Sequence, residues 1–182
     1  MAPNATIFKA TLHIADIDQH YYEDHTLTLA RHPSETDERM MVRLLAFALH
    51  AHEDLAFGRG IGTDGEPALW QKDLTGAIDL WIEVGEPDDK ILRQACGRAT
   101  RVIVYSYGGK GADRWWEKTG TALSRCTNLT VVTIPQDGSR ALAQLAQRSM
   151  DLHCSIQEGQ IFMGDGTTAV QLALTTLSGT AP

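Results

Sequence analysis

A strand, a helix and a second strand follow one another in the middle of the chain, and this succession constrains the fold more than any other feature. Residues 76–84 form a predicted strand, residues 86–99 carry apolar side chains at helical spacing, and residues 102–105 are an apolar run typical of a buried strand. Strands that are joined through a helix within about 30 residues run parallel. The sequence therefore predicts an α/β fold.

Antiparallel strands are predicted at both ends of this unit. Polar and apolar residues alternate over residues 5–17, and residues 25–30 return after a turn, so a long hairpin is expected. Three turned-back strands are expected near the end of the sequence, at residues 152–156, 160–163 and 169–174. We therefore expect one domain over residues 1–182, with a mixed β-sheet flanked by helices and additional antiparallel strands at both termini.

Further helices and strands are predicted between these elements. Ser34 followed by Asp37 resembles a capping box, and apolar spacing continues the helix to about Glu53. Other predicted helices cover residues 110–118 and 141–147, and other predicted strands cover residues 57–61, 68–72 and 129–134.

Composition narrows the function classes. The 182 residues carry a net charge of −7, which argues against indiscriminate binding to nucleic acid but leaves local basic patches open. Cys96, Cys126 and Cys154 are widely spaced, so neither a disulfide framework nor a cysteine zinc site is expected. The seven histidines show no ligand spacing, and surface or hydrogen-bonded roles are expected for them. With no signal segment or spanning apolar run in the sequence, we expect a cytoplasmic protein without a membrane partner.

The strand at residues 78–84 carries the first candidate chemistry. Alternation predicts that Ile78, Leu80, Ile82 and Val84 form an apolar face under the following helix, and that Asp79, Trp81 and Glu83 share the opposite face. Carboxylates beneath a helix are costly unless they are paired or bound to a metal. The alternative is a half-exposed strand whose second face is hydrated.

Glu38 is the third candidate acid. It begins the helical stripe of Met41, Leu45 and Ala48 that should face the core, although a carboxylate at a helix N-terminus also has a purely electrostatic explanation. A helix packed on the sheet by this stripe would bring Glu38 near Asp79 or Glu83. Three carboxylates suit Mg²⁺ or Mn²⁺, which activate water for phosphodiester hydrolysis.

Three segments together resemble the signature blocks of the bacterial YaeQ family. They are Thr28-Leu29-Ala30-Arg31-His32-Pro33-Ser34-Glu35-Thr36, then Glu38-Arg39-Met40-Met41, then Ile78-Asp79-Leu80-Trp81-Ile82-Glu83-Val84-Gly85. This resemblance covers essentially the whole chain and implies a PD-(D/E)XK nuclease-like, restriction-endonuclease-like fold. In that fold a helical acid, here Glu38, accompanies a hairpin with Asp and then Glu-x-Lys, here Asp79 and Glu83, as catalytic and metal-binding residues.

The sequence departs from this pattern in two ways. Gly85 stands where the lysine of Glu-x-Lys is expected, so Lys90 or Lys110 would have to replace it. Asp79 and Glu83 are also about 13 Å apart on a regular strand, at ~3.3 Å per residue. A bend in the strand, or Glu66 from the neighbouring strand, would then have to complete the site.

Two functions follow from these residues. The first is a divalent-metal-dependent nuclease, using Mg²⁺ or Mn²⁺, that acts on or binds nucleic acid through a degenerate Glu-x-Lys motif. The second is a non-catalytic binding or regulatory protein on a nuclease scaffold, with a protein partner. The retained acids favour the enzyme, whereas Gly85 and the acidic net charge favour the binding protein.

Overall fold

The computed structural model describes residues 4–61 and 63–182 and contains two mixed β-sheets and four α-helices. The strands are β1 (Thr6–Asp16), β2 (Tyr21–Arg31), β3 (Leu55–Phe57), β4 (Leu69–Lys72), β5 (Ile78–Val84), β6 (Ala99–Ser106), β7 (Leu129–Thr133), β8 (Ser149–Gln157), β9 (Gln160–Gly164), β10 (Ala169–Leu172) and β11 (Thr175–Ser178). The helices are α1 (Asp37–Leu49), α2 (Asp89–Arg98), α3 (Lys110–Thr119) and α4 (Gln136–Gln144). One sheet has the strand order β10-β9-β8-β1-β2 and the other β11-β7-β6-β5-β4-β3.

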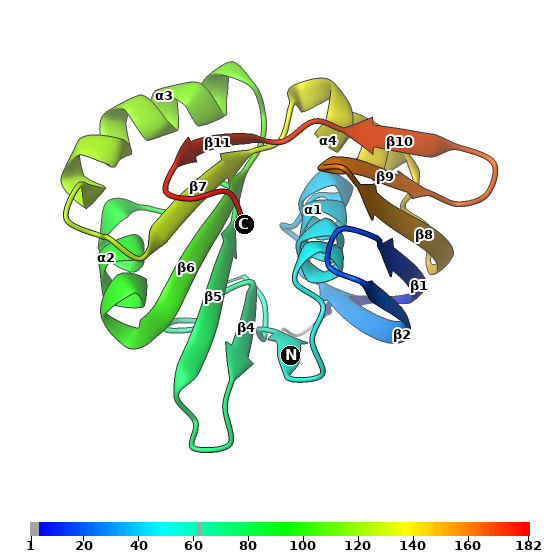
Figure 1. Ribbon diagram of the computed structural model, residues 1–182, viewed down its shortest axis with the longest axis horizontal. Coiled ribbons are helices and arrows are strands. Elements are labelled where there is room, and N and C mark those ends of the chain that lie inside the picture. The colour runs from blue at the N-terminus through cyan, green and yellow to red at the C-terminus, as the bar shows by residue number, and fades with distance from the viewer. Residues whose placement is uncertain (1–3, 62) are drawn as a thin grey trace.

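The helices and sheets are arranged in layers (Figure 1). Helices α1 and α4 lie between the two sheets, while α2 and α3 cover the opposite face of the six-stranded sheet. Among the described residues no helix covers the second face of the five-stranded sheet, and β8 accordingly alternates exposed and buried residues along its whole length. The predicted α/β class is confirmed.

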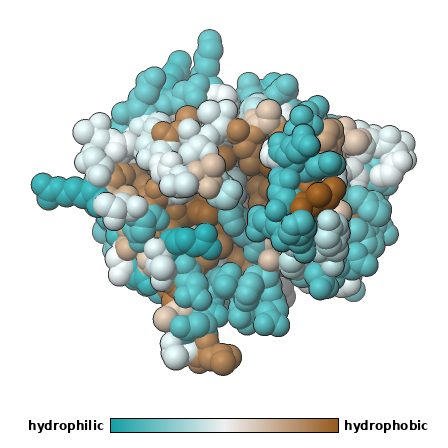
Figure 2. Space-filling model, in the orientation of Figure 1, coloured by the Kyte–Doolittle hydropathy of each residue, from teal (hydrophilic) through white to brown (hydrophobic). Residues whose placement is uncertain are grey.

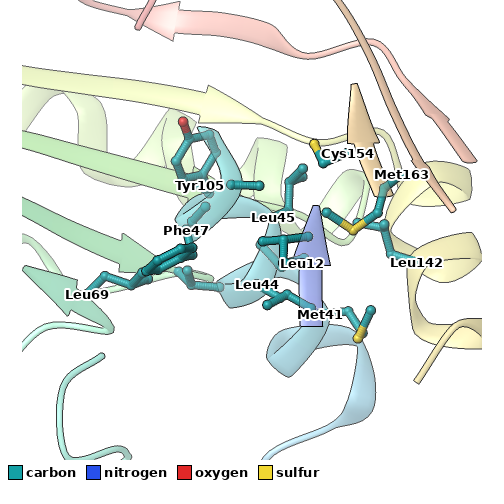
Figure 3. Packing of buried hydrophobic residues seen from close by; sticks show 14 of the residues in the cluster. Leu12, Met41, Leu44, Leu45, Phe47, Leu69, Tyr105, Leu142, Cys154 and Met163 are labelled. Atoms are coloured by element: carbon teal, nitrogen blue, oxygen red, sulfur yellow. The ribbon is translucent and has the colours of Figure 1, made fainter. Parts of the chain in front are cut away.

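Helix α1 is the centre of the larger hydrophobic core. Every side chain from Met40 to Ala48 is buried, because one sheet packs on each side of the helix. Figure 3 shows Leu44, Leu45 and Phe47 of α1 among side chains from both sheets, with Leu12 on one side and Leu69 on the other. A helix enclosed in this way holds the two sheets together.

One charged residue lies in the enclosed part of α1. The Arg43 guanidinium donates to both carboxylate oxygens of Glu35, at 2.7 and 2.9 Å, and to the carbonyl oxygen of Ala30 at 3.2 Å. The side chains of Arg43 and Glu35 are 4% and 2% exposed, so the buried Arg43 charge depends on Glu35 for compensation.

The observed strands differ from the predicted ones in several boundaries and in the sheet to which the terminal strands belong. The predicted terminal strands do not extend the central sheet; they form the separate five-stranded sheet, in which β1 pairs with β8 in parallel. The last strand, β11, was not predicted and returns to the edge of the six-stranded sheet beside β7. The strand predicted at residues 57–61 was misplaced, because β3 covers Leu55–Phe57 and shares only Phe57 with it.

Two helices also differ from the prediction. The N-cap of α1 is Thr36, whose hydroxyl accepts from the Arg39 amide at 3.1 Å, rather than Ser34. Helix α1 ends at Leu49 instead of Glu53. The next residue, His50, has its imidazole hydrogen-bonded to the Tyr105 hydroxyl at 2.6 Å. Helix α4 begins after Pro135, five residues before the predicted start; its first turn is too polar in sequence to show the apolar spacing.

The surface is mostly polar on the face shown in Figure 2, with apolar residues near the middle of that face and at the tip of the β4–β5 hairpin. None of the helices in the described residues has the length and apolar character needed to cross a membrane.

The buried ion pair gives a test of how α1 is held. Replacing Glu35 with alanine leaves the Arg43 guanidinium buried without its carboxylate, so we expect the free energy of unfolding to fall by about 3–5 kcal/mol. Urea unfolding followed by circular dichroism measures this change. Asp89→Ala, which removes an exposed ion pair with Arg93, is the control and should cost less than about 1 kcal/mol. Equal losses in the two variants would contradict the role given to the buried pair.

Candidate functional site

A cleft of about 760 Å³ opens at the carboxyl end of β5. Its walls come from the end of β5, from the loop around residues 63–68, from the start of α2 and from Arg39 in the first turn of α1. In α/β sheets the carboxyl ends of parallel strands are the usual position of ligand sites. This cleft is therefore the candidate functional site.

Glu83 is the predicted acid that lies in this cleft. Its side chain is partly buried, and the indole N–H of Trp81, two residues earlier on the same face, donates to its Oε1 at 2.9 Å. Burial raises the pKa of Glu83 to about 7, although the Trp81 hydrogen bond and the nearby Arg39 charge both act in the opposite direction. Glu83 therefore changes its charge near neutral pH.

Basic side chains face the same cleft. Arg39 donates to Glu35 at 2.8 Å, which holds its guanidinium at the start of α1. Arg98 of α2 lies over the Trp81 ring, with its Cζ 4.9 Å from the ring centroid, and donates to the carbonyl oxygen of Gly65 at 2.9 Å. Both arginines are thus fixed by contacts with the walls of the cleft, and positive charge near a carboxylate suits a phosphate-bearing ligand.

Glu66, the predicted reserve ligand, also lines the cleft. It accepts from the backbone amide of Arg59 at 2.9 Å and from the guanidinium of the same residue at 2.7 Å. These hydrogen bonds lower the pKa of Glu66. If the β4–β5 register is continued by one residue, Ala68 stands opposite Glu83. Glu66 lies two residues further along the chain from that position, toward the N-terminus.

The other two predicted acids lie elsewhere. Glu38 accepts a hydrogen bond from the Ser139 hydroxyl of α4 at 2.6 Å, and it is not among the residues that line the cleft. Asp79 is at the opposite end of β5 and does not line the cleft either. Within residues 4–61 and 63–182, the structure does not bring Glu38, Asp79 and Glu83 into one group with ligand-atom spacing.

The separation of Asp79 from Glu83 follows from the regularity of β5. This strand pairs with β6 in an unbroken parallel register. Its pairing with β4 is irregular at Asp79, but the strand does not bulge between Asp79 and Glu83. The distance between the two residues along the strand therefore stays near 13 Å, at ~3.3 Å per residue.

The structure reverses the predicted assignment of the two faces of β5. Leu80, Ile82 and Val84 pack toward α1, whereas Trp81 packs with α2 in the second core cluster. The face that carries Glu83 is therefore the one beneath α2. The bulge at Asp79 also moves Ile78 into this second cluster.

Gly85, at the expected lysine position, has a φ of +100°, a conformation that side chains other than glycine rarely adopt. A lysine would therefore be strained at this position. Lys90, in the first turn of α2, lines the cleft and Lys110 does not. Of the two proposed substitutes, Lys90 is the one that lines the same cleft as Glu83.

Sequence reasoning missed the arginines of the cleft. The signal for Arg39 was its spacing of four residues from Glu35, which predicts a helical ion pair. No sequence signal connected Arg98 with Trp81 or Gly65, because Arg98 and Gly65 are 33 positions apart and contacts at such separation leave no periodic pattern. The tryptophans of α3, Trp115 and Trp116, pack against the second core cluster, and the Trp115 indole donates to the carbonyl oxygen of Pro87 at 2.7 Å.

The fold and the cleft define an α/β protein with two sheets and a mixed-charge site at the carboxyl end of its central strands. The chain belongs to the YaeQ family, because residues 1–174 match the family model described as "YaeQ protein".

Named relatives and solved structures agree with this assignment. The protein described as "Uncharacterized protein YaeQ" from Escherichia coli (strain K12) is 41% identical over 175 residues, covering 96% of this chain and 97% of the relative. The crystal structure of the YaeQ protein from Xanthomonas axonopodis pv. citri has a TM-score of 0.93 at 45% identity and covers 97% of this chain and 100% of that one. The YaeQ protein from Pseudomonas syringae has the same TM-score at 38% identity, covering 98% and 99%.

The pKa of Glu83 predicts a pH-dependent stability. Between pH 4.5 and about 7 the native protein keeps a proton that the unfolded chain has released, so this residue lowers stability as pH rises through that interval. We expect Glu83→Gln to be more stable than the wild type at pH 8, by on the order of 2–3 kcal/mol, and to show no such gain at pH 4. Urea unfolding at the two pH values measures the difference, with the exposed Glu53→Gln as the control for lost charge. A gain of the same size at pH 4 would contradict the assignment.

Proposed function

We propose that the protein is a divalent-metal-dependent phosphodiesterase that acts on nucleic acid, with Glu83 as the central acid of its site. The observation that carries this proposal is the position of the Glu83 carboxylate, which lies in the cleft together with Arg39, Lys90 and Arg98. An acid that can hold a hard cation and several basic groups that can neutralise phosphate are the two requirements of such a site.

The order of elements supports the same proposal. Helix α1, the β4–β5 hairpin, helix α2 and strand β6 follow one another in the order that the nuclease resemblance implies. Glu38 and Glu83 occupy the helix and hairpin positions of that pattern.

The chemistry of the donors fits Mg²⁺ or Mn²⁺. Glu83 has a second carboxylate oxygen beyond the one that accepts from Trp81, and Mg²⁺ commonly uses one or two carboxylates together with water and substrate phosphate. When bound, such an ion would activate a water and neutralise charge on the phosphate. In this proposal Lys90 orients the phosphate in place of the missing lysine, and Arg39 and Arg98 hold the nucleic-acid backbone.

Glu38 and Asp79 remain proposed ligands. For Glu38 to join Glu83 it would have to leave the Ser139 hydroxyl, and for Asp79 the strand β5 would have to bend. These changes can be tested one residue at a time.

A second candidate function is binding without hydrolysis. Two observations favour this binding function. A lysine would be strained at Gly85, where the Glu-x-Lys pattern expects one, and the three acids are separated. In this function the cleft would bind a partner through its charged walls.

Cleavage in the presence of metal tests the first function. Purified protein with Mn²⁺ should cut plasmid DNA or single-stranded RNA, and Glu83→Gln should lower the rate by about 10²-fold or more, because the central acid is lost. Gel electrophoresis of the products measures the rate, and Glu53→Gln should retain wild-type activity. Glu38→Gln and Asp79→Asn, assayed in parallel, test the other two ligands.

The outcomes separate the two functions. Absence of cleavage on DNA and RNA with either ion, or equal cleavage by Glu83→Gln, would exclude the enzyme. Metal-independent retention of nucleic acid in the same samples would then support the binding function.

Lys90 gives a more specific test. If its ammonium group replaces the lysine of Glu-x-Lys, Lys90→Ala should lower cleavage by about 10²-fold with little change in the free energy of unfolding. Lys118→Ala removes an exposed lysine from the last turn of α3 and should be unaffected. Equal rates in the two variants would show that Lys90 has no part in the reaction.

A further inference from the structure

Three neighbouring strands of the five-stranded sheet bring histidines and aspartates together on the face without helices. His13 of β1 pairs directly with Asp24 of β2 in antiparallel register and with His153 of β8 in parallel register. Asp151 lies two residues before His153, so it points to the same face of the sheet. The register therefore brings two imidazoles and two carboxylates together on one face, with His13 between Asp24 and Asp151.

The side chains are in close contact. His13 Nε2 is 2.9 Å from Asp151 Oδ1, and His153 Nε2 is 3.9 Å from the same oxygen. The two imidazole rings are stacked, with centroids 4.6 Å apart. One donor atom from each of His13, Asp151 and His153 lies within 4.8 Å of the others.

We propose that His13, Asp151 and His153 form a binding site for a divalent transition metal of the zinc class, and that Asp24 positions His13 for it. Zinc takes imidazole nitrogen and carboxylate oxygen at about 2.0–2.2 Å, so its ligand atoms are roughly 3–3.5 Å apart in a tetrahedral site. His13 Nε2 and Asp151 Oδ1 are already near that spacing at 2.9 Å, and the exposed His153 ring, which now stacks on His13, would have to turn out of the stack to direct its Nε2 to the same ion.

Asp24 supplies the second observation that points to a metal. Its Oδ1 is 2.8 Å from Nδ1 of His13, the nitrogen that faces away from Asp151. A carboxylate that accepts from Nδ1–H leaves the lone pair on Nε2, which is the arrangement found behind many zinc-binding histidines. When His13 is protonated at both nitrogens, Nε2–H donates to Asp151, and on binding the metal would replace this proton, which would pass to water, while Nδ1–H continues to donate to Asp24.

The site has room for further ligands. The side chains of His153 and Asp151 are 67% and 71% exposed, so a metal can reach them from solvent. His153 also lines an adjoining cleft of about 290 Å³ together with Phe162 and Thr168, where a water can complete the coordination. Imidazole nitrogen favours zinc, copper or nickel over magnesium, so this site differs from that of Glu83 in the metal it selects.

Metal titration of the full chain, without a histidine tag and after dialysis against a chelator, tests this proposal. Isothermal titration with Zn²⁺ should give one equivalent per chain, and Co²⁺ should give the visible absorption of a low-symmetry site. His153→Ala and Asp151→Asn should each weaken binding at least about 10-fold, and Asp24→Asn should weaken it by about 10–100-fold.

His52→Ala is the matched control, because His52 is another exposed histidine near an aspartate, with Nδ1 3.7 Å from Asp54. It should bind Zn²⁺ as the wild type does. Absence of Zn²⁺ binding in the wild type, unchanged binding in His153→Ala, or displacement of Zn²⁺ by equimolar Mg²⁺ would overturn the proposal. Because His153 is exposed, circular dichroism of His153→Ala should match the wild type. The Zn²⁺ affinity is measured without any nuclease assay, so the site of His13, Asp151 and His153 is tested separately from the cleft of Glu83.

Discussion

The enclosure of α1 between two sheets is the constraint on which the rest of the structure depends. A helix whose residues 40–48 are all buried must be apolar on every side, and Arg43 is accommodated only because Glu35 neutralises it. The first turn of α1 lies at the carboxyl end of β5, where Arg39 and Glu83 line the same cleft. Arg39 reaches the cleft from this turn, so the core that joins the sheets also sets the charge around Glu83.

Local patterns predicted much of the fold. The terminal hairpins, the β5–α2–β6 unit and the core-facing residues of β1 follow from side-chain periodicity, which depends only on neighbours in sequence. The partners of the strands could not be read in this way. Alternation says which face of β1 is buried but not that β8 lies beside it, and the short polar-rich β11 has no pattern of its own. Two sheets were therefore found where one was expected.

The local nature of these patterns also explains which residues of the candidate sites were predicted and which were missed. Glu83 was identified because it shares a strand face with Trp81, a relation visible at a spacing of two residues. The assignment of that face failed because two helices compete to cover β5, and α1, not the helix that follows, covers the apolar side. His13 and Asp151 escaped notice because 138 positions separate them, and ligand spacing within a short segment cannot detect such a pair.

The pairing of β1 with β8 also has a consequence for the order of assembly during synthesis. The strands β3 to β7 and helices α1 to α3 leave the ribosome as a contiguous block, whereas the opening hairpin has to wait for residues 149–157 before β1 gains its second neighbour. Until then the edge of β1 that pairs with β8 has unpaired backbone groups. Sequence-distant contacts of this kind slow folding, so the newly made N-terminal hairpin is the segment most exposed to aggregation and to chaperone capture.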